Sequence, residues 1–451
     1  MQRESLGSRL GFILISAGCA IGIGNVWKFP YLCGQSGGGL FVLVYLFFLI
    51  ILGLPTMTME FAMGRASRKS PVRMYQELEP KGSKWHLHGI LCMIGNYLLM
   101  MYYSTVAGWM LQYFFRTAAG SFENLDADQV AGAFTGGLAS PLIQVGCMAI
   151  VVALGFFVNS QGLQNGLEKV TKVMMLALLV IMVILAVNSI FLPGAGEGLK
   201  FYLLPSLKRA KEVGIFQVIA SAMNQAFFTL SIGIGSMAIF GSYIGRDQAL
   251  LGESVNVVIL DTFVAICSGL IIFPACFAYG VQPDSGPGLI FITLPNIFNH
   301  MALGRLWGSL FFVFMTFAAF STVLAVFENI MAMCMDQFVW TRKQSGLYNA
   351  IAMTILSLPC ALGFNVWSFI QPLGEGSSVL DFEDLIVSNY ILPIGAFIFV
   401  LFCTTRYGWG WDNFVKEADE GNGLKVQKWM RPYMTFILPL IVILVFILGV
   451  I

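Results

Sequence analysis

The residues of this sequence that could do chemistry centre on one glycine string that occurs twice. Residues 21–24 are IGIG and precede Asn25, and residues 232–235 are IGIG and precede Ser236. Each Gly weakens a helix by about 1 kcal/mol relative to Ala, so both apolar segments are expected to unwind at these strings. Unwinding frees backbone groups that need partners in hydrocarbon. Freed carbonyl oxygens suit a small cation, and freed N–H groups at the start of a half-helix suit a carboxylate.

Polar side chains lie where such ligands would be held. Asn25 follows the first string, Thr229 and Ser231 precede the second, and Ser321 and Thr322 lie together in a later apolar segment. Hydroxyl, amide and carbonyl oxygens suit Na⁺ rather than a transition metal. A close-packed helix face is the alternative explanation of IGIG, since Gly is common in membrane helices. Two strings at equivalent places favour a paired site, suited to a zwitterion and a co-transported cation.

The low content of charged residues indicates which elements carry these groups. Of the 451 residues, 57% are hydrophobic and 11% are charged, whereas soluble domains have roughly 25% charged residues. A large soluble enzyme is therefore excluded, and one polytopic membrane domain, 1–451, is expected in a lipid bilayer. The net charge of +1 argues against a nucleic-acid partner. The three histidines and nine cysteines form no HExxH or CxxC pattern, so no cofactor is expected beyond coupling ions.

Eleven apolar segments have about the 20 residues that a membrane span needs. The predicted spans are 10–34, 38–64, 88–118, 141–158, 166–191, 214–244, 250–280, 304–338, 346–363, 382–405 and 433–451. Most of the segments rich in Lys and Arg alternate with acidic ones, and the positive-inside rule then places the N-terminus in the cytoplasm of a cell-membrane protein. The segment with Lys200, Lys208, Arg209 and Lys211 breaks this alternation. An odd number of spans places the C-terminus outside.

Each glycine string opens a group of five predicted spans. The groups are 10–191 and 214–405, and the last span, 433–451, follows them. Five spans reverse the direction of the chain, so the second group would be inverted relative to the first. Matched glycine-interrupted segments in an inverted repeat indicate a transporter with its binding site near the midplane. The expected fold is an all-α polytopic membrane protein of two inverted five-helix repeats, with broken first and sixth helices, plus an eleventh helix.

The motifs of this sequence resemble those of the neurotransmitter:sodium symporter family, and the resemblance extends from Arg3 to about Arg406. The motifs are RLG at 9–11, GCAIGIGNVWKFP at 18–30, GGG at 37–39, EFAMG at 60–64, YY at 102–103 and FFTLSIGIG at 227–235. The sequence is most similar to the bacterial members that carry hydrophobic amino acids. The resemblance implies sodium-coupled symport of neutral hydrophobic or aromatic L-amino acids, from leucine-like to tryptophan-like, by alternating access.

The resemblance also implies which residues hold two Na⁺ ions and the substrate. The first ion would be held by the Ala20 carbonyl, Asn25, Thr229, Asp261 and the substrate carboxylate; the second by the carbonyls of Gly18, Ile21 and Ala318 and the hydroxyls of Ser321 and Thr322. The substrate carboxylate would meet the N–H groups near Ile23 and Gly24 and the Tyr103 hydroxyl. Its side chain would meet Leu99, Val106, Phe228, Ser231, Ile234, Phe320 and Val326.

Three departures from the family pattern are informative. Many amine carriers have Asp where this chain has Gly22, so the substrate is expected to bring its own carboxylate. Asp261 stands where Asn is usual, and Ala265 stands where a Ser helps to bind chloride. We therefore expect Asp261 to supply the fixed negative charge and transport to be independent of chloride. A Pro ten residues after a Gly often helps the fifth helix to unwind, whereas here Leu176 follows Gly166; the inner part of this helix opens differently, or the sequence is altered.

The resemblance also implies two gates and a brace for the sixth helix. Lys28 stands where the family usually has Arg, and by resemblance it is expected to pair with Asp384 across the outer vestibule, above an aromatic lid formed by Phe228 and Tyr103. Arg3 and Asp336 are candidates for an inner ion pair, and Arg3 is equally well explained as a positive-inside anchor. Glu60 is expected to brace the unwound sixth helix. Because Asp261 and Glu328 are both intramembrane acids, a proton-coupled carrier is the main alternative; an ion channel would need a polar pore that is not apparent.

Overall fold

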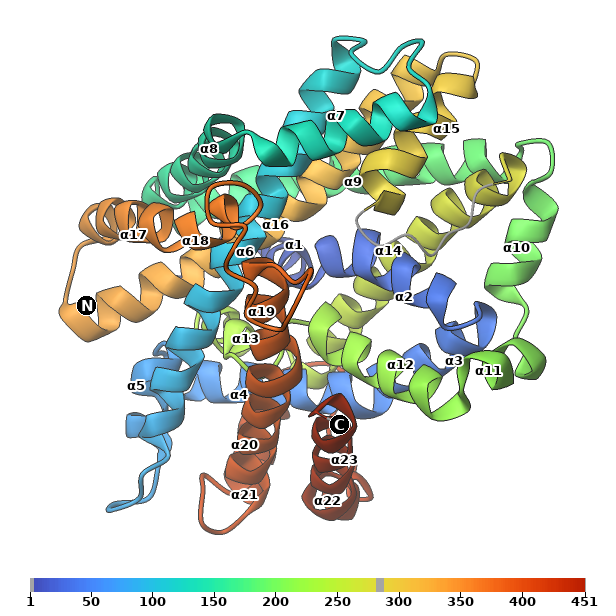
Figure 1. Ribbon diagram of the computed structural model, residues 1–451. Coiled ribbons are helices and arrows are strands. Elements are labelled where there is room, and N and C mark those ends of the chain that lie inside the picture. Colours follow the sequence, from blue (N-terminus) through green and yellow to red (C-terminus); the bar gives the residue numbers. More distant parts are fainter. Residues whose placement is uncertain (1–3, 281–287, 451) are drawn as a thin grey trace.

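Residues 4–280 and 288–450 are described by a computed structural model, and their regular secondary structure is helical (Figure 1). The helices are α1 Arg9–Ala20, α2 Phe29–Gln35, α3 Gly39–Phe48, α4 Leu54–Ser67, α5 Pro71–Leu78, α6 His86–Ala118, α7 Ala127–Ala139, α8 Pro141–Ser160, α9 Lys169–Ile190, α10 Ala195–Leu203, α11 Leu207–Val213, α12 Ile215–Thr229, α13 Ser236–Gly241, α14 Leu250–Ala278, α15 Leu294–His300, α16 Gly304–Phe338, α17 Arg342–Leu356, α18 Leu358–Leu362, α19 Val379–Leu385, α20 Leu392–Thr404, α21 Trp411–Ala418, α22 Met430–Pro432 and α23 Leu438–Val450.

The described helices confirm the predicted membrane fold. Nine of them, counted through their π-helical turns, are long and apolar enough to cross a membrane, and a bent pair, Arg9–Ala20 with Gly24–Gln35, adds a tenth. The sixth predicted span, 214–244, is the pair α12 and α13, with residues 230–235 between them. These segments account for all eleven predicted spans, because an apolar stretch of this length can satisfy its backbone in hydrocarbon only as a helix.

Both predicted breaks are present. The first helix stops at Ala20, resumes at Gly24 and bends by 52°. In the second break, Ser231, Gly233 and Gly235 have positive φ angles of 51°, 98° and 73°. Such angles cost little for Gly and cannot continue a right-handed helix. By contrast, α9 is continuous through Leu176, where the family often has a Pro.

Prolines explain five π-helical interruptions of the α-helices. Six π-helical segments occur in the described residues, at Gly24–Lys28, Leu49–Gly53, Leu163–Glu168, Leu289–Thr293, Ile386–Ile391 and Tyr433–Ile437. All but the third are followed two residues later by a proline: Pro30, Pro55, Pro295, Pro393 and Pro439. A proline lacks the N–H of a normal turn, and its ring clashes with the carbonyl four residues earlier. A π turn is wider and relieves that clash. Because each π turn contains one extra residue, it also rotates the side chains that follow it around the helix axis.

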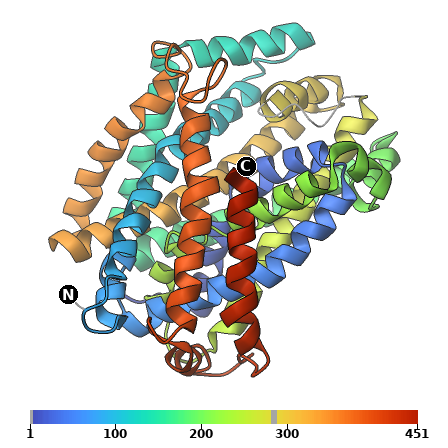
Figure 2. The same cartoon turned by 60° about the horizontal axis from the view of Figure 1, so that its bottom comes forward.

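The two longest helices form the centre of the molecule and position the breaks. α6 and α16 pack along each other, and the broken first helix packs against α16 and α14 (Figure 1). The C-terminal helix α23 lies beside α20 at the periphery (Figure 2). Short helices that hydropathy did not predict, among them α7, α10 and α21, lie in the connections between spans. The two breaks therefore meet in the interior, flanked by α6 and α16.

Candidate functional site

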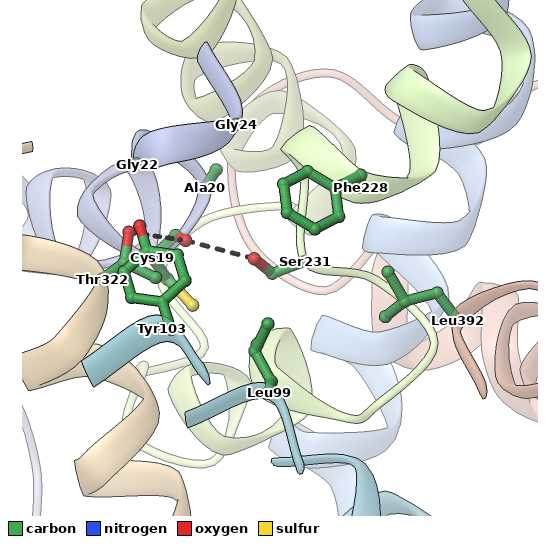
Figure 3. Close-up of a pocket in the computed structure, with 10 residues that line it drawn as sticks. All are labelled: Cys19, Ala20, Gly22, Gly24, Leu99, Tyr103, Phe228, Ser231, Thr322 and Leu392. Carbon is green, nitrogen blue, oxygen red and sulfur yellow. Dashed lines mark hydrogen bonds between the residues drawn. The ribbon is translucent and has the colours of Figure 1, made fainter. Parts of the chain in front are cut away.

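A small cavity lies between the two broken helices. Its volume is about 20 Å³, room for about one water molecule. It is lined by Cys19, Ala20, Gly22, Gly24, Leu99, Tyr103, Phe228, Ser231, Thr322 and Leu392. Figure 3 shows Tyr103, Thr322 and Cys19 together on one side and Leu392 on the other, with Phe228 and Ser231 between them. The cavity is thus polar at one end and apolar at the other.

The polar end presents freed backbone groups of the first break. The Ile23 N–H donates to the Tyr103 hydroxyl at 2.9 Å, and the Gly22 N–H donates to the Asn25 side-chain oxygen at 3.2 Å. A Cβ at Gly22 would lie 2.2 Å from the Tyr103 hydroxyl and 2.4 Å from the Thr322 hydroxyl, so a side chain at this position would have to displace both hydroxyls. The chain has no acid at this position, unlike many amine carriers. A ligand carboxylate is the group that Tyr103 and these N–H donors suit.

Asp261 is fully buried in α14 and contacts Asn25, which lies beside the first break. Asn25 donates to one carboxylate oxygen at 2.8 Å. Thr229 donates at 3.2 Å and Tyr45 at 3.4 Å. All three donors are neutral, and burial of an ionised carboxylate without a positive charge is costly. The cluster of Asp261, Asn25 and Thr229 therefore has the chemistry to hold a small cation.

A second group of oxygen atoms joins α1 to α16. The Ser321 hydroxyl donates to the carbonyls of Ile21 at 3.2 Å and Ala318 at 2.9 Å. The Thr322 hydroxyl is 3.2 Å from the carbonyls of both Gly18 and Ile21. These are the five residues that the resemblance implies for a second sodium ion, and the structure brings their oxygens together. An oxygen-only set of this kind suits a hard monovalent cation.

Two side chains brace the unwound part of the sixth helix. The Gly233 N–H donates to a carboxylate oxygen of the buried Glu60 at 2.6 Å, as expected of a brace. The Asn96 amide donates to the freed Ile234 carbonyl at 2.9 Å. Sequence analysis did not single out Asn96, and a lone Asn in an apolar helix is the signal that could have found it. Each brace satisfies a backbone group that the break exposes.

The residues expected to bind the substrate, through its carboxylate or its side chain, divide into three groups. Gly24, Leu99, Tyr103, Phe228 and Ser231 line the central cavity. Ile23 and Val106 line a second cavity of about 230 Å³, which also contacts Tyr103 and Phe228. Ile234, Phe320 and Val326 are not among the central lining residues, whereas Cys19, Thr322 and Leu392 are.

Ile234 lies elsewhere because the break turns its peptide toward α6. Its carbonyl meets Asn96, and its side chain packs where a Cβ on Gly95 would come within 2.7 Å. Helical periodicity cannot predict the facing of a residue in an unwound segment, since the 3.6-residue repeat ends where the helix ends.

An ion pair between Lys28 and Asp384 lies in the lining of the second cavity. Lys28 Nζ lies 2.9 Å from Asp384, which also accepts hydrogen bonds from Tyr102 and Ser388. The same Nζ lies 3.9 Å from the centre of the Phe228 ring. Tyr103 and Phe228 line both cavities, so their rings separate them. The structure thus brings together the four residues expected at the outer gate and its lid.

The C-terminal half of α16 takes part in a network of hydrogen bonds and ion pairs that sequence analysis did not predict. Glu328 is fully buried, accepts a hydrogen bond from Tyr243 at 2.7 Å and pairs with Arg342 at 2.7 Å. Arg342 also pairs with Glu4. Asp336 accepts the Ser70 N–H at 2.7 Å. Arg3, its expected partner, lies outside the described residues.

Known proteins resemble the chain over nearly its whole length. The model of the sodium:neurotransmitter symporter family matches residues 3–126 and 133–451. The uncharacterized sodium-dependent transporter YhdH of Bacillus subtilis (strain 168) is 33% identical over 98% of this chain and 96% of its own. The sodium-dependent serotonin transporter of Drosophila melanogaster is 28% identical over 99% and 76%. The crystal structure of MhsT in complex with L-phenylalanine superposes with a TM-score of 0.89 at 35% identity, covering 99% of this chain and all of that one.

Proposed function

The chain belongs to the sodium:neurotransmitter symporter family, and on this premise we propose that it is a sodium-coupled symporter of neutral hydrophobic L-amino acids, leucine-like to tryptophan-like. The family is one of transporters and not of enzymes. One observation carries the proposal: the central cavity has the hydroxyls of Tyr103 and Thr322 on one side and the apolar side chain of Leu392 on the other, with Phe228 between them (Figure 3). That polarity suits a carboxylate joined to an apolar side chain, such as the phenylalanine that MhsT binds.

Two sodium ions are proposed to couple transport. The first is held by Asn25, Thr229, Asp261, the Ala20 carbonyl and the substrate carboxylate. The second is held by the group that joins α1 to α16, with Ser321 and Thr322. Because Asp261 has only neutral side-chain donors among the described residues, its charge balances the first ion and makes chloride unnecessary. Support for this comes from Ala265, whose methyl group cannot bind an anion.

Ser321→Ala is expected to raise the sodium concentration for half-maximal leucine binding about three- to tenfold, because it removes one oxygen ligand worth about 1 kcal/mol. The measurement is binding of radiolabelled leucine to purified protein across a sodium titration. Ser309→Ala is the matched control, since Ser309 lies in the same helix, is only half-buried and bonds to the Arg305 carbonyl one turn earlier. An unchanged sodium titration of Ser321→Ala would exclude Ser321 as a ligand.

The N-terminus is proposed to lie in the cytoplasm and the C-terminus outside, and 10–191 and 214–405 are proposed to be the inverted repeats.

Lys28 and Asp384 are proposed to form the outer gate. Lys28→Met is expected to speed leucine dissociation at least about threefold, because the variant loses the ion pair with Asp384 that would hold the gate shut. Lys200→Met is the control, since it removes an exposed ion pair with Glu197. Equal dissociation rates for Lys28→Met and the parent would argue against a gate. Arg3 and Asp336 are proposed to form an ion pair at the inner gate.

Uptake into proteoliposomes tests the proposed function. Radiolabelled leucine and tryptophan are supplied with a sodium gradient, a proton gradient or neither. We expect accumulation with the sodium gradient alone. Proton coupling through Glu328 is disfavoured because both of its carboxylate oxygens already accept hydrogen bonds from Arg342. Accumulation driven by protons without sodium would overturn the coupling ion, and failure to accumulate any neutral amino acid would overturn the substrate class.

A further inference from the structure

Leu392 is the part of the central cavity that no motif predicted. It is the first residue of α20 and is buried, and it is the cavity's lining residue from the tenth predicted span. In Figure 3 it lies on the side of the cavity away from Tyr103 and Thr322. A ligand whose carboxylate meets Tyr103 must therefore direct its side chain toward Leu392. The position of Leu392 bears on the side chain of the ligand and not on its carboxylate.

The π turn before Leu392 decides that this residue faces the cavity. The Leu392 N–H bonds to the Val387 carbonyl, five residues earlier, at the end of the π-helical segment Ile386–Ile391. Pro393 follows and has no N–H to donate to a normal α turn. One residue more or less in the turn would rotate all later side chains by about 100° around the helix axis. The sequence pair Leu-Pro thus places an apolar side chain at the end of the cavity.

The backbone behind Leu392 cannot move away to make room. A Cβ on Gly395 would lie 1.8 Å from the Gly233 carbonyl oxygen, and a Cβ on Gly233 would lie 2.2 Å from the Leu392 carbonyl oxygen. The unwound sixth helix and α20 therefore touch main chain to main chain. Main-chain atoms packed in this way can move apart much less than the atoms of a side chain that can change its rotamer. Any adjustment of the apolar end to a larger ligand must come from side chains, and Leu392 and Leu99 are the aliphatic ones there.

We infer that Leu392 is a specificity-determining residue that sets the largest substrate side chain the carrier accepts. The inference rests on the proposed function, since it assumes a neutral amino acid bound through its carboxylate. A cavity of about 20 Å³ requires the apolar wall to yield before an aromatic side chain enters. Replacing Leu392 by a smaller residue would favour large substrates, and replacing it by a larger residue would exclude them. One methylene in such a pocket changes discrimination by about 10- to 200-fold.

The experiment measures competition by alanine, valine, leucine, phenylalanine and tryptophan against radiolabelled leucine, in sodium, on purified full-length protein. For Leu392→Ala we expect the ratio of tryptophan to valine affinity to rise at least about tenfold. For Leu392→Phe the same ratio should fall at least about tenfold, while alanine and valine still bind. Ile394→Ala and Ile394→Phe are matched controls, because Ile394 lies two residues further along α20 and outside the cavity lining. Their rank order should equal that of the parent.

The outcomes separate this inference from the proposed function. If the parent binds no neutral amino acid in sodium, the proposed function fails, and the inference fails with it. If the parent binds and both Leu392 variants keep the parental rank order, the inference alone is wrong. Equal weakening of all five ligands by Leu392→Ala would also overturn it, because it would show a general packing role. If Leu392→Phe fails to fold, the rise expected for Leu392→Ala against its control Ile394→Ala decides the test.

Discussion

Asp261→Asn is expected to reduce sodium-driven leucine uptake in chloride-free medium at least about tenfold. The substitution keeps the shape of the side chain and removes the charge that faces Asn25, Thr229 and Tyr45. Interactions with a charged group contribute about 1.5–3 kcal/mol, which corresponds to about 10- to 150-fold in affinity. The measurement is initial uptake into proteoliposomes in gluconate and in chloride at equal sodium.

A second variant tests whether the charge of Asp261 replaces chloride. Ala265 lies one helical turn after Asp261, on the same side of α14, and is fully buried. The double variant Asp261→Asn with Ala265→Ser should regain uptake in chloride and not in gluconate, because it restores the Ser that helps to bind chloride in the family and removes the fixed negative charge. Asp412→Asn is the control, since Asp412 is 92% exposed on α21. Parental uptake by Asp261→Asn in gluconate would show that the charge is not needed.

Gly395→Ala is expected to have the largest effect on folding. Its Cβ would lie 1.8 Å from the Gly233 carbonyl oxygen, and both partners are main chain. Gly233 is held at a φ of 98° and by its hydrogen bond to Glu60, so the clash cannot be relieved locally. Overpacking costs about 1–3 kcal/mol where side chains can adjust, and more is expected here. Thermal unfolding in detergent and the yield of monodisperse protein measure the effect.

Gly132→Ala is the matched control for that substitution. Gly132 lies in α7, where a new Cβ meets nothing within 4 Å. Replacing a helical Gly by Ala there should stabilise the protein by up to about 1 kcal/mol. Equal unfolding temperatures for Gly395→Ala and the parent would mean that the unwound sixth helix does not rest on α20 as tightly as the structure describes.

The existence and place of both helix breaks could be predicted from the sequence. Residues 21–24 and 232–235 lose helical propensity locally, through glycine, and the structure has breaks after Ala20 and between Thr229 and Ser236. Propensity acts over a few residues, so no tertiary information is needed. The eleven spans were predictable for a similar reason, because in a bilayer an apolar stretch of about 20 residues has few alternatives to a helix.

Pairs of residues far apart in the chain were predictable only through family resemblance. Lys28 and Asp384 are separated by 356 residues, and Glu60 and Gly233 by 173. No periodicity connects them. The motifs around them indicated the pairing because they resemble motifs of proteins with the same fold. The chain's own departures, Asp261 and Ala265, were visible in the sequence, and the neutral partners of Asp261 became visible only in the structure.

What the sequence by itself determined, then, is where the helices break and which atoms the breaks release, because both depend on local composition. Only the tertiary structure decided which partners receive those atoms. Ile234 turns toward Asn96, Glu328 pairs with Arg342, and Leu392 enters the cavity after a π turn. An unwound backbone has no repeat that fixes the direction of its side chains, so the packing of neighbouring helices sets it.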